Sequence, residues 1–307
     1  MRSYPALLVL AALCALSGCG DDGAPKDHGL SVEEQASHPT GDAVQIEYAF
    51  GDGETWIADL VFHAQRTQKR TDRAESQKAS AKSTFRLKQT YVGGADPRSE
   101  TWLEYTRIQD AEGKDVEVPK GVTRGSFPYD AEGRPDSTAL EITGDLVAES
   151  KTLYRSLLLA GLGGTEAWIP PRPVREGETW RAAETINPQL LKAISMLAQR
   201  PDVALPPAKL SGSFRLEKIE RTETGTFLHV HANLLIEIRG ETLSDNTRGE
   251  MSMGYRVEGF AKVDLRTGLP VELDTRAVMD NNETMAGQSF NQRLELGLRG
   301  TVRREGE

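Results

Sequence analysis

Two histidines spaced two residues apart have the types and spacing best suited to chemistry in this chain. His229 and His231 flank Val230 in an alternating pattern, so both imidazoles lie on one face of a predicted strand, about 7 Å apart. With carboxylates from neighbouring strands they could hold a metal ion or transfer a proton, as in a metal-dependent hydrolase. Their face is polar, however, and two hydrogen-bonded or solvated histidines are the plainer interpretation. We keep both as candidate metal ligands.

Short motifs that mark common active sites are absent from the sequence. It contains no Gly-x-Ser-x-Gly elbow, no Walker phosphate loop, no His-Glu-x-x-His and no cysteine ligand pair. We therefore expect no catalytic residue, no cofactor and a protein that is not an enzyme. Carboxylates are numerous, but the sequence cannot place two of them across a cleft, so a two-carboxylate hydrolase stays open.

The tetrapeptide Leu-Ser-Gly-Cys that ends at Cys19 follows a short apolar stretch. Arg2 precedes that stretch. The apolar run from Ala6 to Leu16 is shorter than a transmembrane helix, which needs about 20 residues. The tetrapeptide resembles the lipobox of bacterial lipoproteins, whose cysteine receives lipid before the chain is cut in front of it. The resemblance implies a signal peptide at residues 1–18 and a mature protein that begins at Cys19, acylated with fatty acids such as palmitate. The alternative is an ordinary secretory signal with a chance cysteine.

A lipobox places the protein in the bacterial cell envelope, with the membrane as its partner through Cys19. Gly20 follows the cysteine, which by resemblance to known sorting rules favours the outer membrane over the inner one; the periplasmic or surface side stays open. The net charge of −9, which becomes −10 when Arg2 is removed, argues against a nucleic-acid partner. Only Cys14 and Cys19 occur, and Cys14 leaves with the signal, so we expect no disulfide.

Residues 19–41 form a predicted tether between the anchor and the body. They are rich in glycine, proline and charge and have no apolar periodicity, so they should behave as a flexible coil of about 25 Å end-to-end distance. The roughly 265 residues that follow are enough to bury a core. We divide them into an N-terminal β half at 42–170 and a C-terminal β half at 171–307.

Three stretches of the body alternate between apolar and polar residues with a period of two, at 227–239, 250–264 and 289–302. This alternation is typical of a strand with one dry face and one wet face. The stretches are much longer than an ordinary strand of 5 or 6 residues. We therefore predict a mainly β fold of long antiparallel strands, in a curved sheet or sheets or an incomplete barrel.

Turns and two short helices complete the predicted secondary structure. The helices are expected at about 149–162 and 188–199, where leucines recur at helical spacing, and Pro188 suits the first position of the second helix. Turns that join neighbouring strands and end in glycine are expected at 110–113, 130–133, 222–225 and 264–268.

Short strings recur in the two halves in the same order. Residues 53–56 (Gly-Glu-Thr-Trp) return at 177–180, residues 85–87 (Phe-Arg-Leu) return at 214–216, and the pattern of 130–135 returns at 264–270. The offsets grow slowly, which favours two related halves, although strings this short also recur by chance.

A second resemblance covers the C-terminal half or somewhat more of the chain. Residues 171–180 read Pro-x-Pro-Val-x-x-Gly-x-x-Trp, and residues 259–268 follow with a strand and a glycine turn. Together they are similar to a pattern in uncharacterised bacterial lipoproteins, which implies no activity. Physically, the first motif is a rigid entry into a turn, with Trp180 as its first large buried side chain.

Three functions of different classes fit these observations. The one we favour is a non-enzymatic binding or carrier module for an apolar ligand, such as an acyl chain, or for a protein partner. Met251, Met253 and Tyr255 are its candidate ligand-binding residues because flexible methionines suit adaptable apolar surfaces, although the same side chains also suit a plain core. The alternatives are a structural or assembly protein of the envelope and a metal-dependent hydrolase that uses His229 and His231.

Overall fold

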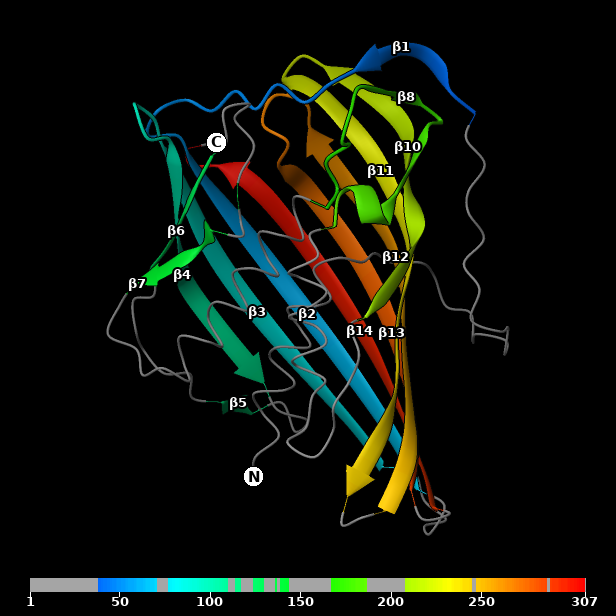
Figure 1. The fold of residues 1–307 in the computed structure, drawn as a ribbon. Helices are drawn as coiled ribbons and strands as arrows, with labels where there is room; N and C mark the ends of the chain where they lie inside the picture. The colour runs from blue at the N-terminus through cyan, green and yellow to red at the C-terminus, as the bar shows by residue number, and fades with distance from the viewer. Residues whose placement is uncertain are drawn as a thin grey trace.

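The computed structural model describes residues 38–70, 77–109, 114–116, 124–129, 136, 139–143, 167–186, 208–244, 247–285 and 288–306. The predicted signal peptide, Cys19 and nearly all of the predicted tether therefore lie outside the described residues. Most described residues are in strands (Figure 1). The strands are β1 (Thr40–Val44), β2 (Thr55–Arg70), β3 (Gln77–Val92), β4 (Arg98–Gln109), β5 (Asp115–Val116), β6 (Arg124–Pro128), β7 (Glu141–Thr143), β8 (Val174–Glu176), β9 (Thr179–Arg181), β10 (Lys209–Thr222), β11 (Gly225–Ser244), β12 (Thr247–Asp264), β13 (Pro270–Met285) and β14 (Gln288–Arg304).

Twelve of these strands form one antiparallel sheet. Its order is β7-β6-β4-β3-β2-β14-β13-β12-β11-β10-β9, with β5 attached to β4, while β1 and β8 pair separately. The long strands twist and curve together (Figure 1). The end strands β7 and β9 do not pair with each other, so the sheet is open. The predicted mainly β fold of long antiparallel strands in a curved sheet is confirmed.

Strands from both ends of the chain meet in the middle of the sheet. β14, the last strand, pairs with β2 over fifteen residue pairs, from Phe290 opposite Arg70 to Arg304 opposite Trp56. From β10 to β14 each strand pairs with the next in the sequence, as the predicted turns at 222–225 and 264–268 require. The turns predicted at 110–113 and 130–133 lie outside the described residues. Residues of both predicted halves thus contribute to one continuous sheet.

A single turn of 3₁₀ helix, η3 (Ala182–Glu184), is the helix found in the described ranges. Its carboxylate at Glu184 accepts a hydrogen bond from the backbone N–H of Arg181 at 2.8 Å, which satisfies a donor at the start of the helix. The two helices predicted at 149–162 and 188–199 fall outside the described residues and are not confirmed. No helix among the described residues is long and apolar enough to cross a membrane.

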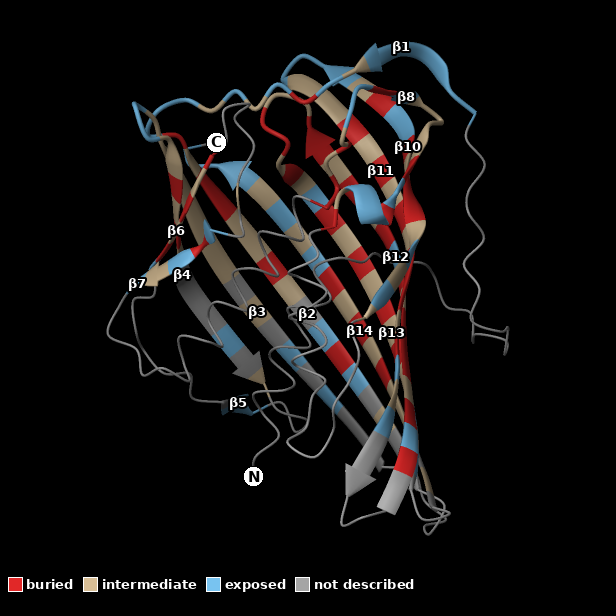
Figure 2. Cartoon of the chain, in the orientation of Figure 1, coloured by how far each residue is buried: buried red, intermediate tan, exposed pale blue. Residues whose placement is uncertain are grey.

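The alternating sequence pattern becomes rows of buried side chains that cross the strands. One row contains Leu234, Val257, Ala277, Leu296 and Ala64, which are neighbours in register on β11, β12, β13, β14 and β2. All five are buried, and the bands of buried residues recur along each strand (Figure 2). We call the sheet face that carries this row the apolar face. Removing it from water stabilises the fold by about 25 cal/mol per Å² of apolar surface.

Charged side chains occupy the opposite face of the same strands. Arg276 and Arg299 form ion pairs with Glu295 and Asp274 across β13 and β14, at 3.4 and 3.3 Å. These pairs are largely exposed, and exposed pairs contribute little to stability, typically below about 1 kcal/mol. The opposite face therefore carries the charged side chains, while the apolar face forms the core.

Two clusters of apolar side chains lie on the sheet. The larger one joins the apolar face to Ile46, Trp168, Val174, Trp180 and Ile186, which come from segments outside the long strands. The smaller one contains Phe127, Tyr129 and Leu140, with Phe50 and Tyr91 packed against them. In the smaller cluster the hydroxyls of Ser99 and Tyr129 are 2.6 Å apart, so its buried polar groups are paired.

Residues 44–50, which we call the strap, cross the turn between β12 and β13 on their way from β1 to β2. The backbone N–H groups of Glu47 and Ala49 donate to the carbonyls of Leu265 and Arg266, at 3.0 and 2.7 Å. Tyr48 between them has a positive φ of 51°, which is uncommon for a residue with a side chain. The strap thus fixes the start of the body to a turn more than 200 residues later.

The edge of the sheet at β10 is partly covered. β9 pairs with only three residues of β10, from Ser213 to Arg215. A bulge follows at Leu216 and Lys218, and beyond it the N–H of Ile219 donates to the carboxylate of Glu176 at 2.6 Å. A side chain therefore satisfies a backbone donor that would otherwise point outward from the sheet.

The two Gly-Glu-Thr-Trp strings form the same local structure. Gly53 and Gly177 have φ values of 72° and 77°, and the glutamate after each accepts a hydrogen bond from the backbone N–H three residues earlier. Gly53 and Glu54 bond to both backbone groups of Tyr91, and Gly177 and Glu178 do the same with Leu216. The two turns are therefore structural equivalents.

The second recurring string does not share this equivalence. Tyr91 and Leu216 hold matching positions, so Phe214 corresponds to Gln89 rather than to Phe85. In register, Trp180 lies opposite Phe214, whereas Trp56 lies opposite Gln89. Pairing the two Phe-Arg-Leu strings was therefore wrong by four residues. The first copy of the third string, at residues 130–135, lies outside the described residues. Its second copy, at 264–270, is described, so the structure does not compare the two.

Candidate functional site

The two histidines of the candidate metal site each have a carboxylate partner of their own. His229 Nε2 lies 2.8 Å from Glu220 Oε2, and His231 Nε2 lies 3.9 Å from Glu258 Oε1. Each ring thus has the nearby carboxylate that the sequence analysis required. The two carboxylates belong to different strands, however, and no group of three metal-ligating side chains assembles within the described ranges. His229 is thus hydrogen-bonded to its carboxylate, whereas His231 is within ion-pair distance of its own.

Glu220 is the centre of this polar cluster. Its carboxylate also lies 2.8 Å from Nζ of Lys262, whose ammonium group is 4.5 Å from the ring centroid of Phe227. Hydrogen bonds from Lys262 and then from His229 lower the pKa of Glu220 to about 2. The carboxylate is therefore ionised across the physiological range and is poorly suited to accept a proton in catalysis.

The predicted ligand-binding residues lie on the apolar face of β12. Met251, Met253 and Tyr255 are 4%, 7% and 5% exposed and belong to the larger apolar cluster. The hydroxyl of Tyr255 lies 2.9 Å from Sδ of Met253, so the one polar group among them is directed to a neighbour in the same strand. Their cross-strand neighbours are Ile236, Ile238 and Gly240 on β11, and Met279, Asn281 and Glu283 on β13. They therefore continue the apolar surface of β11, whereas on β13 only the neighbour of Tyr255 is apolar.

Among the residues that the structure describes, three buried tryptophans carry indole N–H groups without a hydrogen-bond acceptor. They are Trp56, Trp168 and Trp180, which are 7%, 0% and 2% exposed. Trp168 and Trp180 both pack against the ring of Phe214, with centroid distances of 5.4 and 5.8 Å. Leaving a buried donor unpaired costs about 1–3 kcal/mol, and most buried polar groups in proteins are paired. Trp168 and Trp180 both belong to the larger apolar cluster, and two such donors in one core are unusual.

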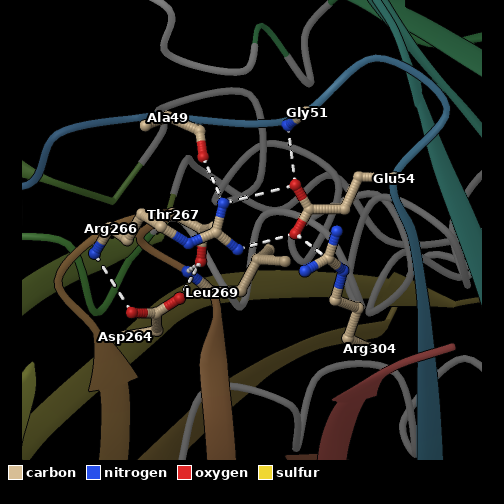
Figure 3. A network of polar contacts seen from close by, with 8 residues as sticks. All are labelled: Ala49, Gly51, Glu54, Asp264, Arg266, Thr267, Leu269 and Arg304. Carbon is tan, nitrogen blue, oxygen red and sulfur yellow. Dashed lines mark hydrogen bonds and ion pairs between the residues drawn. The ribbon is translucent and has the colours of Figure 1, made fainter. Parts of the chain in front are cut away.

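A second polar network lies where the strap meets the sheet. The carboxylate of Glu54 is 2% exposed, and its Oε1 lies 2.6 Å from Arg266 Nη2 and 3.6 Å from Arg304 Nε (Figure 3). The N–H of Gly51 donates to Oε2 at 2.6 Å. Arg266 also donates to the carbonyl of Ala49 at 2.6 Å, and its guanidinium lies 5.8 Å from the ring centroid of Trp56. One carboxylate thus links the strap, β14 and the β12–β13 turn.

Opposing effects act on the pKa of Glu54. Burial acts to raise the pKa, but the hydrogen bonds from Arg266 and Gly51 and the positive charges of Arg266 and Arg304 outweigh it. The pKa of Glu54 is therefore lower than its ordinary value. A fully paired anion of this kind holds elements together, and it offers no free proton acceptor.

Sequence reasoning found the positions of the tryptophans but missed their unpaired donors. Trp180 was expected as a buried side chain after the turn, and the structure confirms its burial. Whether its N–H has an acceptor depends on residues distant in the sequence, and no local pattern reports it. The Glu54 network was missed for the same reason, since Arg266 is 212 residues away. Cys19 lies outside the described residues, so its lipidation stays a prediction.

Comparisons with known proteins give only distant structural similarity. No protein-family model and no curated protein matches the sequence. Among solved structures, the chain is similar to OpdQ of Pseudomonas aeruginosa, with 6% identity, a TM-score of 0.26, and coverage of 82% of this chain and 98% of that one. It is also similar to an outer membrane channel from Pseudomonas putida F1 (7% identity, TM-score 0.21, 84% and 98% covered) and to Ail of Yersinia pestis (10% identity, TM-score 0.13, 82% and 100% covered). Similarity at this level does not establish a shared fold or function.

Proposed function

We propose that this protein is a lipoprotein of the bacterial cell envelope, anchored through Cys19, whose sheet binds an apolar ligand with a long hydrocarbon chain. The observation that carries the proposal is the extent of the apolar face. In the row of Leu234 it runs without interruption from β11 across β12, β13 and β14 to β2, and in the row of Ile236 it reaches from β11 to β14. An apolar surface of this size must be covered by other apolar groups, because exposing it to water is unfavourable.

Met251, Met253 and Tyr255 are buried on the apolar face, so a ligand that reaches them has to displace other groups of the protein. β8 and η3 pack chiefly against β10, and the strap reaches the end of β12 and β13 (Figure 1). Met251 and Met253 lie 11 or more residues along β12 from that end. Unbranched methionines can adapt to a flexible hydrocarbon chain more readily than branched residues can. We therefore assign the region around Met251, Met253 and Tyr255 to ligand contact.

Native mass spectrometry of the intact protein tests this proposal. We expect a non-covalent adduct with the mass of a lipid, both on the protein purified from membranes and on a Cys19→Ser variant. The Cys19→Ser variant should also no longer incorporate labelled palmitate. The Met251→Ala/Met253→Ala variant should bind cis-parinaric acid, a fluorescent fatty acid, several-fold more weakly, because two apolar contacts are shortened. Ser252→Ala is the matched control, since Ser252 lies between the methionines on the opposite face, and it should bind normally.

Two results would contradict the proposal and favour an alternative. A protein partner recovered in stoichiometric amount, with no lipid adduct and no saturable binding of cis-parinaric acid, indicates a structural or assembly role. Zinc bound at one equivalent and lost in His229→Ala, again without lipid, indicates the metal-dependent hydrolase.

A further inference from the structure

Trp168 and Trp180 combine two properties that ordinary core residues do not share. Both are at least 98% buried, and within the described part of the chain neither indole N–H has a hydrogen-bond acceptor. Both also pack against one ring, that of Phe214, Trp168 edge-on and Trp180 stacked. An indole N–H can donate a hydrogen bond but cannot accept one. A group that satisfies these two donors must therefore be an acceptor that enters an apolar region.

We infer that Trp168 and Trp180 form the polar end of the ligand site and donate hydrogen bonds to an uncharged carbonyl oxygen, as in an acyl ester. This inference rests on the proposed function and adds the chemical class of the ligand. The hydrocarbon chain of the ligand lies on the apolar face, and the ester carbonyl lies at the indoles.

The uncharged ester is favoured over a free carboxylate by the charges around the site. Arg181 and Arg215 are the basic residues next to the aromatic pair, and they alternate with Trp180 and Phe214 along β9 and β10. They therefore lie on the other face of the sheet. A buried carboxylate at the indoles would have no cation from these strands, and burying an unpaired anion is strongly unfavourable.

The residues in register with Phe214 continue the site across the sheet. Opposite Phe214 on β11 is Ala232, and Gly259 and Thr275 follow in the same row on β12 and β13. The hydroxyl of Thr275 donates to the carbonyl of Leu298 at 3.0 Å, so this row presents methyl groups and backbone. Because the side chains in this row are small, the hydrocarbon chain of the ligand can lie close to the sheet, beside the larger residues of the next rows.

A pair of probes that differ only at the carbonyl tests the inference. 1-Monolauroylglycerol has an ester carbonyl, and 1-O-dodecylglycerol has an ether in its place. The wild-type protein should bind the ester at least about tenfold more tightly than the ether, because two hydrogen bonds are lost with the carbonyl. In ¹⁵N NMR spectra, the ester should shift the indole N–H signals of Trp168 and Trp180 and leave that of Trp102 in place.

Variants separate the hydrogen bonds from the aromatic packing. Trp168→Phe and Trp180→Phe remove the N–H and keep a ring, so each should lower affinity for the ester and leave affinity for the ether within about twofold. Trp102→Phe is the control. The ring of Trp102 packs against Lys88, whose ammonium group is 5.6 Å from the ring centroid, and its indole N–H is not one of the buried donors without an acceptor. It should change neither affinity.

The outcomes distinguish this inference from the proposed function. If both probes bind equally and no indole signal moves, the tryptophans are structural and the inference is wrong, while ligand binding stands. Tighter binding of laurate than of the ester would also overturn it, because a carboxylate would then be the preferred group. If neither probe binds the wild-type protein, the proposed function fails as well.

Discussion

At the scale of single residues, the protein treats its buried polar groups in two different ways. Glu54 has a cation or N–H at each carboxylate oxygen. The indole N–H groups of Trp168 and Trp180 have no acceptor among the described residues. Fully paired groups stabilise one arrangement of the chain, whereas unpaired ones lower stability unless a ligand completes them. The first pattern belongs to the scaffold and the second to the candidate site.

Glu54→Gln should destabilise the protein by about 1–3 kcal/mol, because an amide keeps the shape but loses the charge that Arg266 and Arg304 face. Glu178→Gln is the matched control from the equivalent turn. Its carboxylate pairs with the half-exposed Arg172, so its loss should cost less than about 1 kcal/mol. Urea unfolding at pH 7 measures both. Equal losses would show that the burial of Glu54 does not strengthen its contacts.

The difference between wild type and Glu54→Gln should also depend on pH. The folded state holds the pKa of Glu54 below the ordinary value of 4.5, so its contribution is present above pH 4.5 and is lost as pH falls through the lower, folded pKa. The two unfolding curves should therefore converge in acid. A constant difference down to the acid transition would contradict the assigned ion pairs.

At the scale of elements, the two equivalent turns differ in what lies next to them. A Cβ on Gly177 would come within 2.1 Å of the carbonyl oxygen of His38, whereas a Cβ on Gly53 would meet nothing within 4 Å. Both glycines have the same left-handed backbone. Substituting each glycine in turn therefore separates two costs in stability: that of a side chain in this backbone conformation, and that of losing the contact between Gly177 and His38.

Gly53→Ala should destabilise by about 1 kcal/mol, the cost of a side chain at positive φ. Gly177→Ala should cost more, because it also displaces His38, whose N–H donates to the Gly177 carbonyl at 3.0 Å. Chemical denaturation gives the two values, and hydrogen exchange at residues 38–50 shows whether the start of the body detaches only in Gly177→Ala. Equal values with unchanged exchange would show that this contact adds nothing.

The long strands were predictable because their signal is local. The alternation at 250–264 and 227–239 gave β12 and β11 to within a few residues at the matching ends, and Gly268 marked their following turn. Other features depend on distant residues. The strap was assigned to no element because its partners lie in the turn at 264–268, and the Phe-Arg-Leu repeat was misplaced because sequence identity does not report register. The same limit hid the unpaired indoles.

At the scale of the whole molecule, β2 and β14 make the two halves of the chain one sheet. Their fifteen register pairs are as extensive as those between strands joined by hairpins. No local pattern predicts this pairing, since 200 or more residues separate the two strands. An interface of this length couples the folding of its two sides, because breaking it exposes backbone and core together.

Thermal unfolding of the protein should therefore be a single cooperative transition, with calorimetric and van't Hoff enthalpies that agree. Leu296 lies in the middle of β14 and is 3% exposed. Leu296→Ala should lower the free energy of unfolding by about 2–5 kcal/mol, and the protein should still unfold in one transition. Val278→Ala on β13 is the control, because it is less buried and lies on the opposite face. Two resolved transitions would show that the halves fold independently.

The short end strands of the sheet also bear on how this protein behaves among other copies of itself. An exposed, regular strand can recruit a second chain and start aggregation. Here β11 has 20 residues, but the end strands β7 and β9 have three each. Beyond β9, the bulge in β10 and the carboxylate of Glu176 on the Ile219 N–H leave little regular backbone to copy. A sheet rich in β-forming sequence therefore offers little regular edge on which a second copy of the chain could add a strand.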